Sequence, residues 1–190
     1  MNLPNKLTVL RMVMIPLFLV FFLSGGIPNN NLWALITFAA AAITDTLDGN
    51  IARKRGLVTD FGKFMDPLAD KLLVMAALVA FVEVLGTPSV VIIIILAREF
   101  LVTALRTLAA NKGVVIAADN WGKIKTVLQM FWIVYTLLLC WLEQTFTALP
   151  VSWDILYFIY SAGMVLVALI TVVSGFNYIW KNRNLFLNDK

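Results

Sequence analysis

Long apolar stretches separated by short polar breaks run along almost the whole chain. An α-helix needs roughly 20 apolar residues to cross a bilayer, and six stretches approach that length. The breaks are rich in glycine, proline and asparagine, which end helices and form turns. We therefore expect a single domain over residues 1–190, an all-α polytopic membrane protein with six transmembrane helices in one bundle. The predicted helices span residues 7–23, 32–53, 62–85, 89–110, 121–142 and 153–180.

The composition is that of an integral membrane protein. Of the 190 residues, 61% are hydrophobic, which excludes an ordinary soluble domain. The chain has no histidine, so zinc–histidine sites and general-base catalysis by histidine are excluded. Its one cysteine, Cys140, cannot form an intrachain disulfide, and we expect it to be a small apolar residue of a helix. No nucleic-acid partner is expected.

The N-terminus has some features of a secretory signal peptide, because Lys6 and Arg11 precede an apolar run. The residues at 24–28 form a poor cleavage site, however, and five more apolar stretches follow. We predict that this segment is retained as the first transmembrane helix.

Basic residues lie at one end of the predicted helices. Most Lys and Arg are near the two termini and around the loops at 54–61 and 111–120. The remaining loops, at 24–31, 86–89 and 143–152, contain neither. By the positive-inside rule, both termini are cytoplasmic, which an even number of helices also requires. We expect a protein of the cell membrane whose basic cytoplasmic rim attracts anionic lipid headgroups.

Four carboxylates lie on the second and third predicted helices. An ionised group at membrane depth costs roughly 2.5–3.5 kcal/mol on insertion scales and marks a functional site by default. Helical periodicity places Asp45, Asp48, Gly49, Ala52 and Arg53 on one face, and Gly62, Asp66 and Asp70 on one face of the next helix. A short loop makes these helices antiparallel. We therefore expect the acidic faces to meet across one cavity at the cytoplasmic side.

Clustered carboxylates repel one another unless cations neutralise them. Oxygen ligands without histidine or cysteine favour Mg²⁺, Mn²⁺ or Ca²⁺. Four aspartates suit two metals that clamp the attacking and leaving oxygens of a phosphoryl transfer. The small residues on the same faces leave room for a ligand, and Arg53 offers a fork that matches phosphate.

Two other interpretations explain less of the pattern. The aspartates could pair with basic residues inside the bundle, for which Lys71, Arg98 and Arg106 are candidates. Such pairing does not explain why four aspartates lie on two facing stripes with glycines between them. A metal or proton transporter would need carboxylates at the midplane and polar residues continuing to the far side. Here the acidic cluster is biased to one side, and the outer halves of the helices are almost wholly apolar.

The aspartate motif resembles the signature of the CDP-alcohol phosphotransferase family. Asp45-x-x-Asp48-Gly49-x-x-Ala52-Arg53 is followed, after eight residues, by Gly62-x-x-x-Asp66-x-x-x-Asp70, and every fixed position of the signature is present. The family is also similar in layout, with about six transmembrane helices and the motif on the second and third. The resemblance implies transfer of a substituted phosphate from a CDP-linked alcohol to a second alcohol, with release of CMP.

The resemblance also implies roles for individual residues. Asp45, Asp48 and Asp66 match the ligands of a first divalent metal, Mg²⁺ or Mn²⁺. Asp45, Asp66 and Asp70 match those of a second. Asp70 also matches the general base that takes the proton from the acceptor hydroxyl. The positions that contact the cytidine and pyrophosphate are matched by Gly49, Ala52, Arg53, Thr59 and Gly62.

A further resemblance concerns the branch of this family that uses CDP-diacylglycerol as donor and sn-glycerol 3-phosphate as acceptor. Pro4-Asn5-Lys6-Leu7-Thr8-x-x-Arg11 is similar to the start of that branch, where these residues lie beside the nucleotide, and Asn5 and Thr8 are the two that we assign to its binding. Asn5 could also simply cap the first helix. The segments Ala97-Arg98-Glu99-Phe100, with Thr103 and Arg106, and Gly122-Lys123-Ile124-Lys125-Thr126 are similar to the same branch.

A dianionic acceptor needs cationic partners, and the implied acceptor residues are Arg98, Arg106, Lys123 and Lys125. Arg98 could instead pair with Glu99 or with an aspartate. Lys123 and Lys125 diverge on a helix, so we expect only one of them, preferably Lys125, to face the cavity.

Sibling enzymes share the signature and use another acceptor, such as serine, an inositol phosphate or phosphatidylglycerol. A neutral or zwitterionic acceptor would not need Arg98, Arg106 and Lys125 together. The resemblance also suggests a homodimer.

Overall fold

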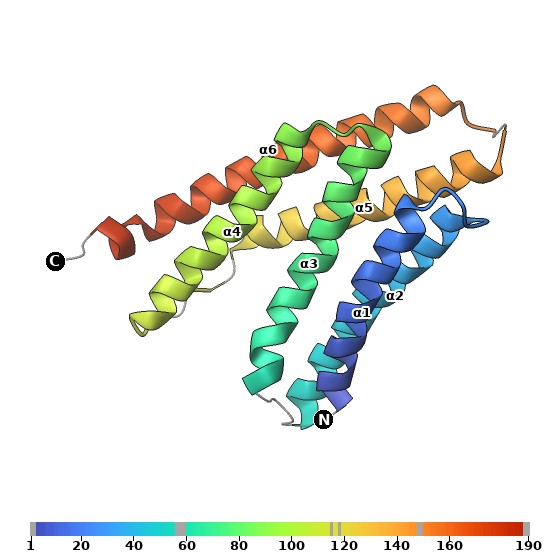
Figure 1. Ribbon diagram of the computed structural model, residues 1–190. Coiled ribbons are helices and arrows are strands. Elements are labelled where there is room, and N and C mark those ends of the chain that lie inside the picture. Colours follow the sequence, from blue (N-terminus) through green and yellow to red (C-terminus); the bar gives the residue numbers. More distant parts are fainter. Residues whose placement is uncertain (1–2, 56–59, 115, 118, 148–149, 188–190) are drawn as a thin grey trace. The chain divides into compact units, whose positions relative to one another are not determined.

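In the part of the chain that it describes, the computed structural model is all-α, with six helices in the order predicted (Figure 1). Residues 3–55, 60–114, 116–117, 119–147 and 150–187 are described, and only the backbone is described at 3–4, 45–55, 60–64, 66–67 and 184–187. The helices are α1 (Leu3–Leu23), α2 (Asn30–Arg55), α3 (Asp60–Leu85), α4 (Ser89–Asn111), α5 (Asn120–Thr145) and α6 (Trp153–Leu187). The prediction of an all-α fold with six helices is confirmed.

Glycine ends α3 and α4 where the sequence predicts breaks, at Gly86 and Gly113. Gly113 follows α4 with φ 75°, a conformation that side chains disfavour. Its N–H bonds the Ala110 carbonyl at 2.9 Å, and the Val114 N–H bonds the Ala109 carbonyl at 2.9 Å, so the end of α4 is a Schellman motif. By contrast, α6 runs past its predicted end at residue 180 to Leu187, because neither glycine nor proline follows to stop it.

Within the described residues, three segments are long and apolar enough to cross a membrane: Asn5–Leu23, Asn120–Thr145 and Trp153–Arg183. Their surfaces carry large exposed apolar side chains, such as Val13, Phe131 and Phe158, as expected of lipid contact. The other helices, α2, α3 and α4, carry the aspartates and arginines of the predicted site. That all six helices span the membrane therefore remains a prediction.

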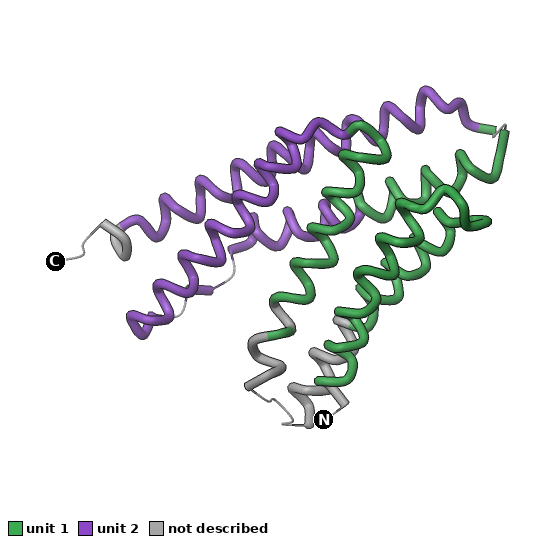
Figure 2. The backbone as a smooth tube through the Cα atoms, in the orientation of Figure 1, with its two compact units in different colours: residues 1–86, 133–150 green, residues 87–132, 151–190 purple. Residues whose placement is uncertain are grey.

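The chain forms two compact units (Figure 2). Unit 1 comprises residues 1–86 and 133–150, and unit 2 comprises residues 87–132 and 151–190. The first half of α5 belongs to unit 2 and its second half to unit 1. The aspartate motif lies in unit 1, and the predicted acceptor residues lie in unit 2.

The core of unit 1 is aromatic where α1 packs against α2 and α3. Phe18 stacks on Phe22 and also meets Phe38 of α2, each with ring centroids 5.7 Å apart. Phe22 meets Phe81 of α3 edge-on at 5.7 Å. These buried rings fix α1 as the helix against which the two motif helices pack.

The core of unit 2 forms where α4 packs against α6. Trp132 of α5 stacks on Tyr160 of α6 at 5.8 Å and donates from Nε1 to the Tyr160 carbonyl at 3.0 Å. A side chain at Gly163 would place its Cβ 2.8 Å from Trp132 Cδ1. The indole therefore fits only because residue 163 is a glycine.

Candidate active site

The aspartate motif lies on two consecutive helices, as its spacing predicts. The backbone of α2 is helical through Asp45, Asp48, Gly49, Ala52 and Arg53, and that of α3 through Gly62, Asp66 and Asp70. The two helices contact each other within unit 1. Thr59 lies outside the described residues, and Asp70 is the only motif residue whose side chain the structure describes.

Asp70 contacts Arg11 of α1. Arg11 Nη1 donates to Asp70 Oδ1 at 2.7 Å, which makes a charge-assisted hydrogen bond. The Arg11 side chain is fully buried, whereas 46% of the Asp70 side chain is exposed. The carboxylate is therefore held by a buried cation and remains accessible to a ligand.

The same face of α1 carries two more predicted site residues. Asn5, Thr8 and Arg11 are all buried, and their spacing of three places them on one helical face. Farther along α1, the buried residues of this face are the apolar Ile15, Phe18 and Phe22. The buried face of α1 thus changes from aromatic in its second half to polar near Asp70.

Asn5 does not cap the first helix. α1 begins at Leu3, so Asn5 lies inside the first turn, whereas a cap residue precedes the helix. The interpretation of Asn5 as a helix cap is therefore wrong, and its predicted place beside the nucleotide stays a prediction.

The donor set of the motif suits hard divalent cations, because carboxylate oxygens are the ligands that such ions prefer. Asp70 has the exposure that a metal ligand needs. Among the described side chains, no three potential metal ligands lie together, and Asp45, Asp48 and Asp66 are not among those side chains. The predicted two-metal site therefore stays a prediction.

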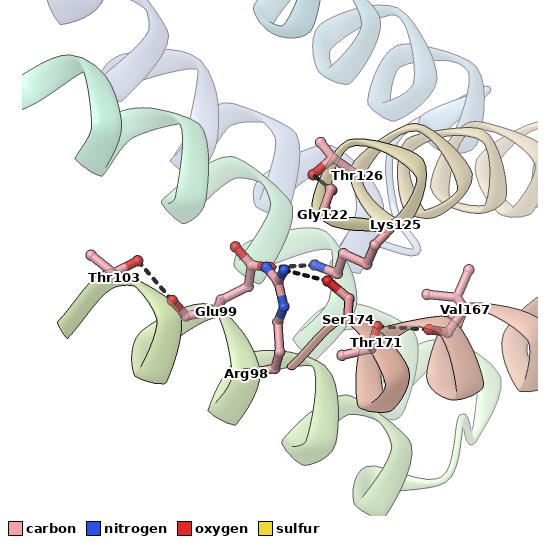
Figure 3. A network of polar contacts seen from close by, with 9 residues as sticks. All are labelled: Arg98, Glu99, Thr103, Gly122, Lys125, Thr126, Val167, Thr171 and Ser174. Atoms are coloured by element: carbon pink, nitrogen blue, oxygen red, sulfur yellow. Dashed lines mark hydrogen bonds and ion pairs between the residues drawn. The ribbon is translucent and has the colours of Figure 1, made fainter. Parts of the chain in front are cut away.

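A second polar cluster lies in unit 2 and joins three helices (Figure 3). Glu99 of α4 accepts hydrogen bonds at Oε1 from Arg98 Nη1, at 3.0 Å, and from Lys125 Nζ of α5. Arg98 also donates from Nη2 to Ser174 Oγ of α6 at 2.6 Å. We call Arg98, Glu99, Lys125 and Ser174 the unit 2 cluster. Of the two partners considered for Arg98, Glu99 and an aspartate, the structure shows Glu99.

The unit 2 cluster has a net positive charge and spare hydrogen-bond donors. It holds two cations and one carboxylate, and the Lys125 side chain is only 2% exposed. A guanidinium has five N–H groups and an ammonium three. Among the described residues, hydrogen bonds use two of these groups on Arg98 and one on Lys125. The buried Arg98 Nε has no hydrogen-bond partner in the described part of the chain.

Two glycines make room for Arg98. A Cβ at Gly122 would lie 3.3 Å from Arg98 Nη2, and a Cβ at Gly175 would lie 3.1 Å from Arg98 Cγ. Both distances are shorter than ordinary van der Waals contact. Arg98 therefore passes between a glycine of α5 and a glycine of α6, and its position is tightly defined.

The other two predicted acceptor residues differ from Lys125 in their surroundings. Lys123 is exposed, so Lys125 is the lysine of this pair that points into unit 2. Arg106 is exposed and lies over the ring of Tyr178, with Cζ 5.6 Å from the ring centroid. The Tyr178 hydroxyl is buried and has no hydrogen-bond partner within the residues described.

Sequence reasoning did not include Arg11, Glu99, Ser174 and Tyr178 among the site residues. Arg11 and Glu99 carried a usable signal, because each is an ionisable group inside an apolar segment. Nothing in the sequence distinguishes Ser174 and Tyr178, because a serine or a tyrosine in an apolar helix is ordinary.

Comparison with known proteins agrees with the predicted resemblance. The sequence profile of the CDP-alcohol phosphatidyltransferase family matches residues 1–174. The chain is 42% identical to the CDP-diacylglycerol–glycerol-3-phosphate 3-phosphatidyltransferase of Bacillus subtilis, over 95% of each chain. It is 43% identical to the protein of the same name from Rickettsia felis, over 68% of this chain and 71% of the other. It is 44% identical to a probable phosphatidylglycerophosphate synthase of Mycobacterium tuberculosis, over 67% of this chain and 62% of the other. The chain therefore belongs to the CDP-alcohol phosphatidyltransferase family.

Proposed function

We propose that this protein transfers the phosphatidyl group of CDP-diacylglycerol to sn-glycerol 3-phosphate, giving phosphatidylglycerophosphate and CMP. The observation that carries the proposal is the 42% identity, over 95% of both chains, to the Bacillus subtilis enzyme named for this reaction. The complete aspartate motif supplies the residues that such a transfer requires.

In the proposed reaction, the acceptor hydroxyl oxygen forms a bond to the phosphorus that carries diacylglycerol. The bond from that phosphorus to the oxygen of CMP breaks, and CMP leaves with the electron pair. Asp70 takes the proton of the attacking hydroxyl. The contact with Arg11 supports this role, because it holds the carboxylate in place and leaves nearly half of the side chain exposed.

We assign two divalent metals, Mg²⁺ or Mn²⁺, to Asp45, Asp48, Asp66 and Asp70. When bound, they would neutralise the pyrophosphate and stabilise the charge on the leaving CMP. The nucleotide is assigned to Asn5, Thr8, Gly49, Ala52, Arg53, Thr59 and Gly62. The buried polar face of α1 supports this assignment for Asn5 and Thr8, because it adjoins Asp70 through Arg11.

We assign the phosphate of the acceptor to Arg98, Lys125 and Arg106. The net charge and spare N–H donors of the unit 2 cluster support this assignment, because a phosphate dianion accepts several charge-assisted hydrogen bonds. Lys123 is exposed and two positions from Lys125, so we place it at the rim of the site.

We further propose that all six helices cross the cell membrane, with both termini and the active site on the cytoplasmic side, and that the protein is a homodimer. Contacts within unit 1 support the helix directions. Gln144, near the end of α5, donates to Asn30 Oδ1, at the start of α2, across 2.7 Å. Six antiparallel crossings would place these two ends on the same side.

A single assay tests the proposed function. Purified protein in detergent is incubated with CDP-diacylglycerol, Mg²⁺ and one acceptor at a time, and CMP release is measured. We expect release with sn-glycerol 3-phosphate and little with serine, an inositol phosphate or phosphatidylglycerol. Release with one of these acceptors, but not with glycerol 3-phosphate, would contradict the proposal.

A further inference from the structure

Glu99 occupies the centre of the unit 2 cluster. It is an acidic residue in a site proposed to bind an anion, so by charge alone it should weaken that binding. Its Oε1 nevertheless contacts both cations of the cluster, Arg98 of α4 and Lys125 of α5. The side chain of Glu99 is 21% exposed, and its carboxylate lies beside both basic groups (Figure 3).

The two cations depend on Glu99 to different degrees. Arg98 is also held by Ser174, at 2.6 Å, and by the fit of its side chain against Gly122 and Gly175. Lys125 has Glu99 as its only ion-pair partner among the described residues. A buried ammonium beside a guanidinium is unfavourable without a carboxylate, because both charges have lost water and repel each other.

We infer that Glu99 is a positioning residue of the acceptor site, which holds the Lys125 ammonium beside the Arg98 guanidinium so that their remaining N–H groups can bind one phosphate dianion. The inference rests on the proposed function. Glu99 does not touch the acceptor in this arrangement. It acts through Lys125, and it reduces the net charge of the unit 2 cluster without using all the N–H donors.

The test is the Glu99→Gln variant, which keeps the size of the side chain and removes its charge. Steady-state CMP release gives separate KM values for glycerol 3-phosphate and CDP-diacylglycerol. We expect the KM for glycerol 3-phosphate to rise about tenfold or more, and that for CDP-diacylglycerol to stay within about twofold. The matched control is Glu83→Gln, since Glu83 is exposed near the end of α3 in unit 1.

Three results in Glu99→Gln would overturn the inference. An unchanged acceptor KM would mean that Lys125 needs no such partner. A lower acceptor KM would mean that Glu99 competes with the acceptor for the cations. An equal rise in both KM values would mean a general structural effect, not positioning of one site.

A double-mutant cycle with Lys125→Met tests whether Glu99 acts through Lys125. We expect the acceptor KM of Glu99→Gln/Lys125→Met to equal that of Lys125→Met within about twofold. A clear further rise in the double variant would overturn the inference. The double variant leaves no unpaired lysine in the site. The comparison of the double variant with Lys125→Met therefore still tests the inference if Glu99→Gln alone does not fold.

The wild-type protein separates this inference from the proposed function. CMP release by the wild type with glycerol 3-phosphate tests the proposed function, and it involves no substitution at Glu99. If another acceptor is the substrate, the same KM comparison is made with that acceptor. A neutral acceptor with a KM that is insensitive to Glu99→Gln would overturn the inference as well.

Discussion

Arg11 of α1 and Asp70 of α3 form a hydrogen-bonded ion pair, with 2.7 Å between Nη1 and Oδ1, although 59 positions separate them in the sequence. Arg11 is buried, and Asp70 is half exposed. A guanidinium is a planar donor that fixes the orientation of a carboxylate better than a flexible ammonium does. The proposed general base is thus oriented by the first helix.

Arg11→Gln should lower turnover because Asp70 then loses its buried cation. We expect kcat to fall about tenfold or more, in line with the loss of a charged hydrogen bond worth about 1.5–3 kcal/mol. The kcat of Arg11→Lys, which keeps the charge but lacks the planar guanidinium, should fall less. The control is Lys6→Gln, because Lys6 is exposed on the same helix. A kcat for Arg11→Gln within about twofold of wild type would contradict an orienting role.

Asp70→Asn should abolish CMP release but leave some metal binding. The substitution removes the proposed general base, while Asp45, Asp48 and Asp66 remain as ligands of the first metal. Mn²⁺ binding, followed by electron paramagnetic resonance, is measured beside turnover. Asp154→Asn, at an exposed position at the start of α6, is the control and should behave as wild type. Full activity in Asp70→Asn would exclude Asp70 as the base.

Arg106→Gln should raise the KM for glycerol 3-phosphate without loss of stability. Arg106 is exposed, and its contact with the Tyr178 ring contributes only about 0.5–1 kcal/mol. Arg183 offers a matched control, since it also lies over an aromatic ring, that of Trp180, at 4.3 Å. We expect about a tenfold rise in the acceptor KM for Arg106→Gln and none for Arg183→Gln. Equal effects of the two substitutions would argue against a specific acceptor contact.

Gly163→Ala should destabilise unit 2. The added methyl group would lie 2.8 Å from Trp132 Cδ1, and the indole is held by its bond to the Tyr160 carbonyl. Overpacking of this kind costs about 1–3 kcal/mol. Thermal unfolding in detergent should show a lower Tm. Gly26→Ala, at a position with no atom within 4 Å of the added group, should leave the Tm unchanged. A Gly163→Ala variant as stable as wild type would mean that Trp132 can shift freely.

Single-cysteine labelling checks the proposed orientation. With Cys140 replaced by alanine, cysteines are introduced at Asn29 and at Lys112, both of which are exposed. A maleimide reagent that does not cross membranes, added to intact cells, should label Asn29→Cys and not Lys112→Cys. After permeabilisation both should react. Labelling of Lys112→Cys in intact cells would reverse the orientation.

Local sequence determined the helices and the placement of the aspartate motif. Glycine and proline mark the breaks, and a helix of 3.6 residues per turn puts residues spaced by three and four on one face. The motif therefore falls on α2 and α3 with the spacing that the sequence predicts. The family resemblance rests on the same residues. These features need no information about which helix packs against which.

The partners of the charged groups were decided only by the tertiary structure. Arg98, Arg106 and Lys71 were candidate partners for the aspartates. Among the described side chains, Asp70 meets Arg11, and Arg98 meets Glu99 and Ser174. Ser174 lies 76 positions from Arg98 in the sequence. A buried charge pairs with the partner that the packed helices bring within hydrogen-bonding distance. Which partner that is depends on how closely the helices pack, and Gly122 and Gly175 leave the space that Arg98 occupies between them. The sequence alone therefore predicts the reaction, and the packing of the helices decides which residue orients each charged group.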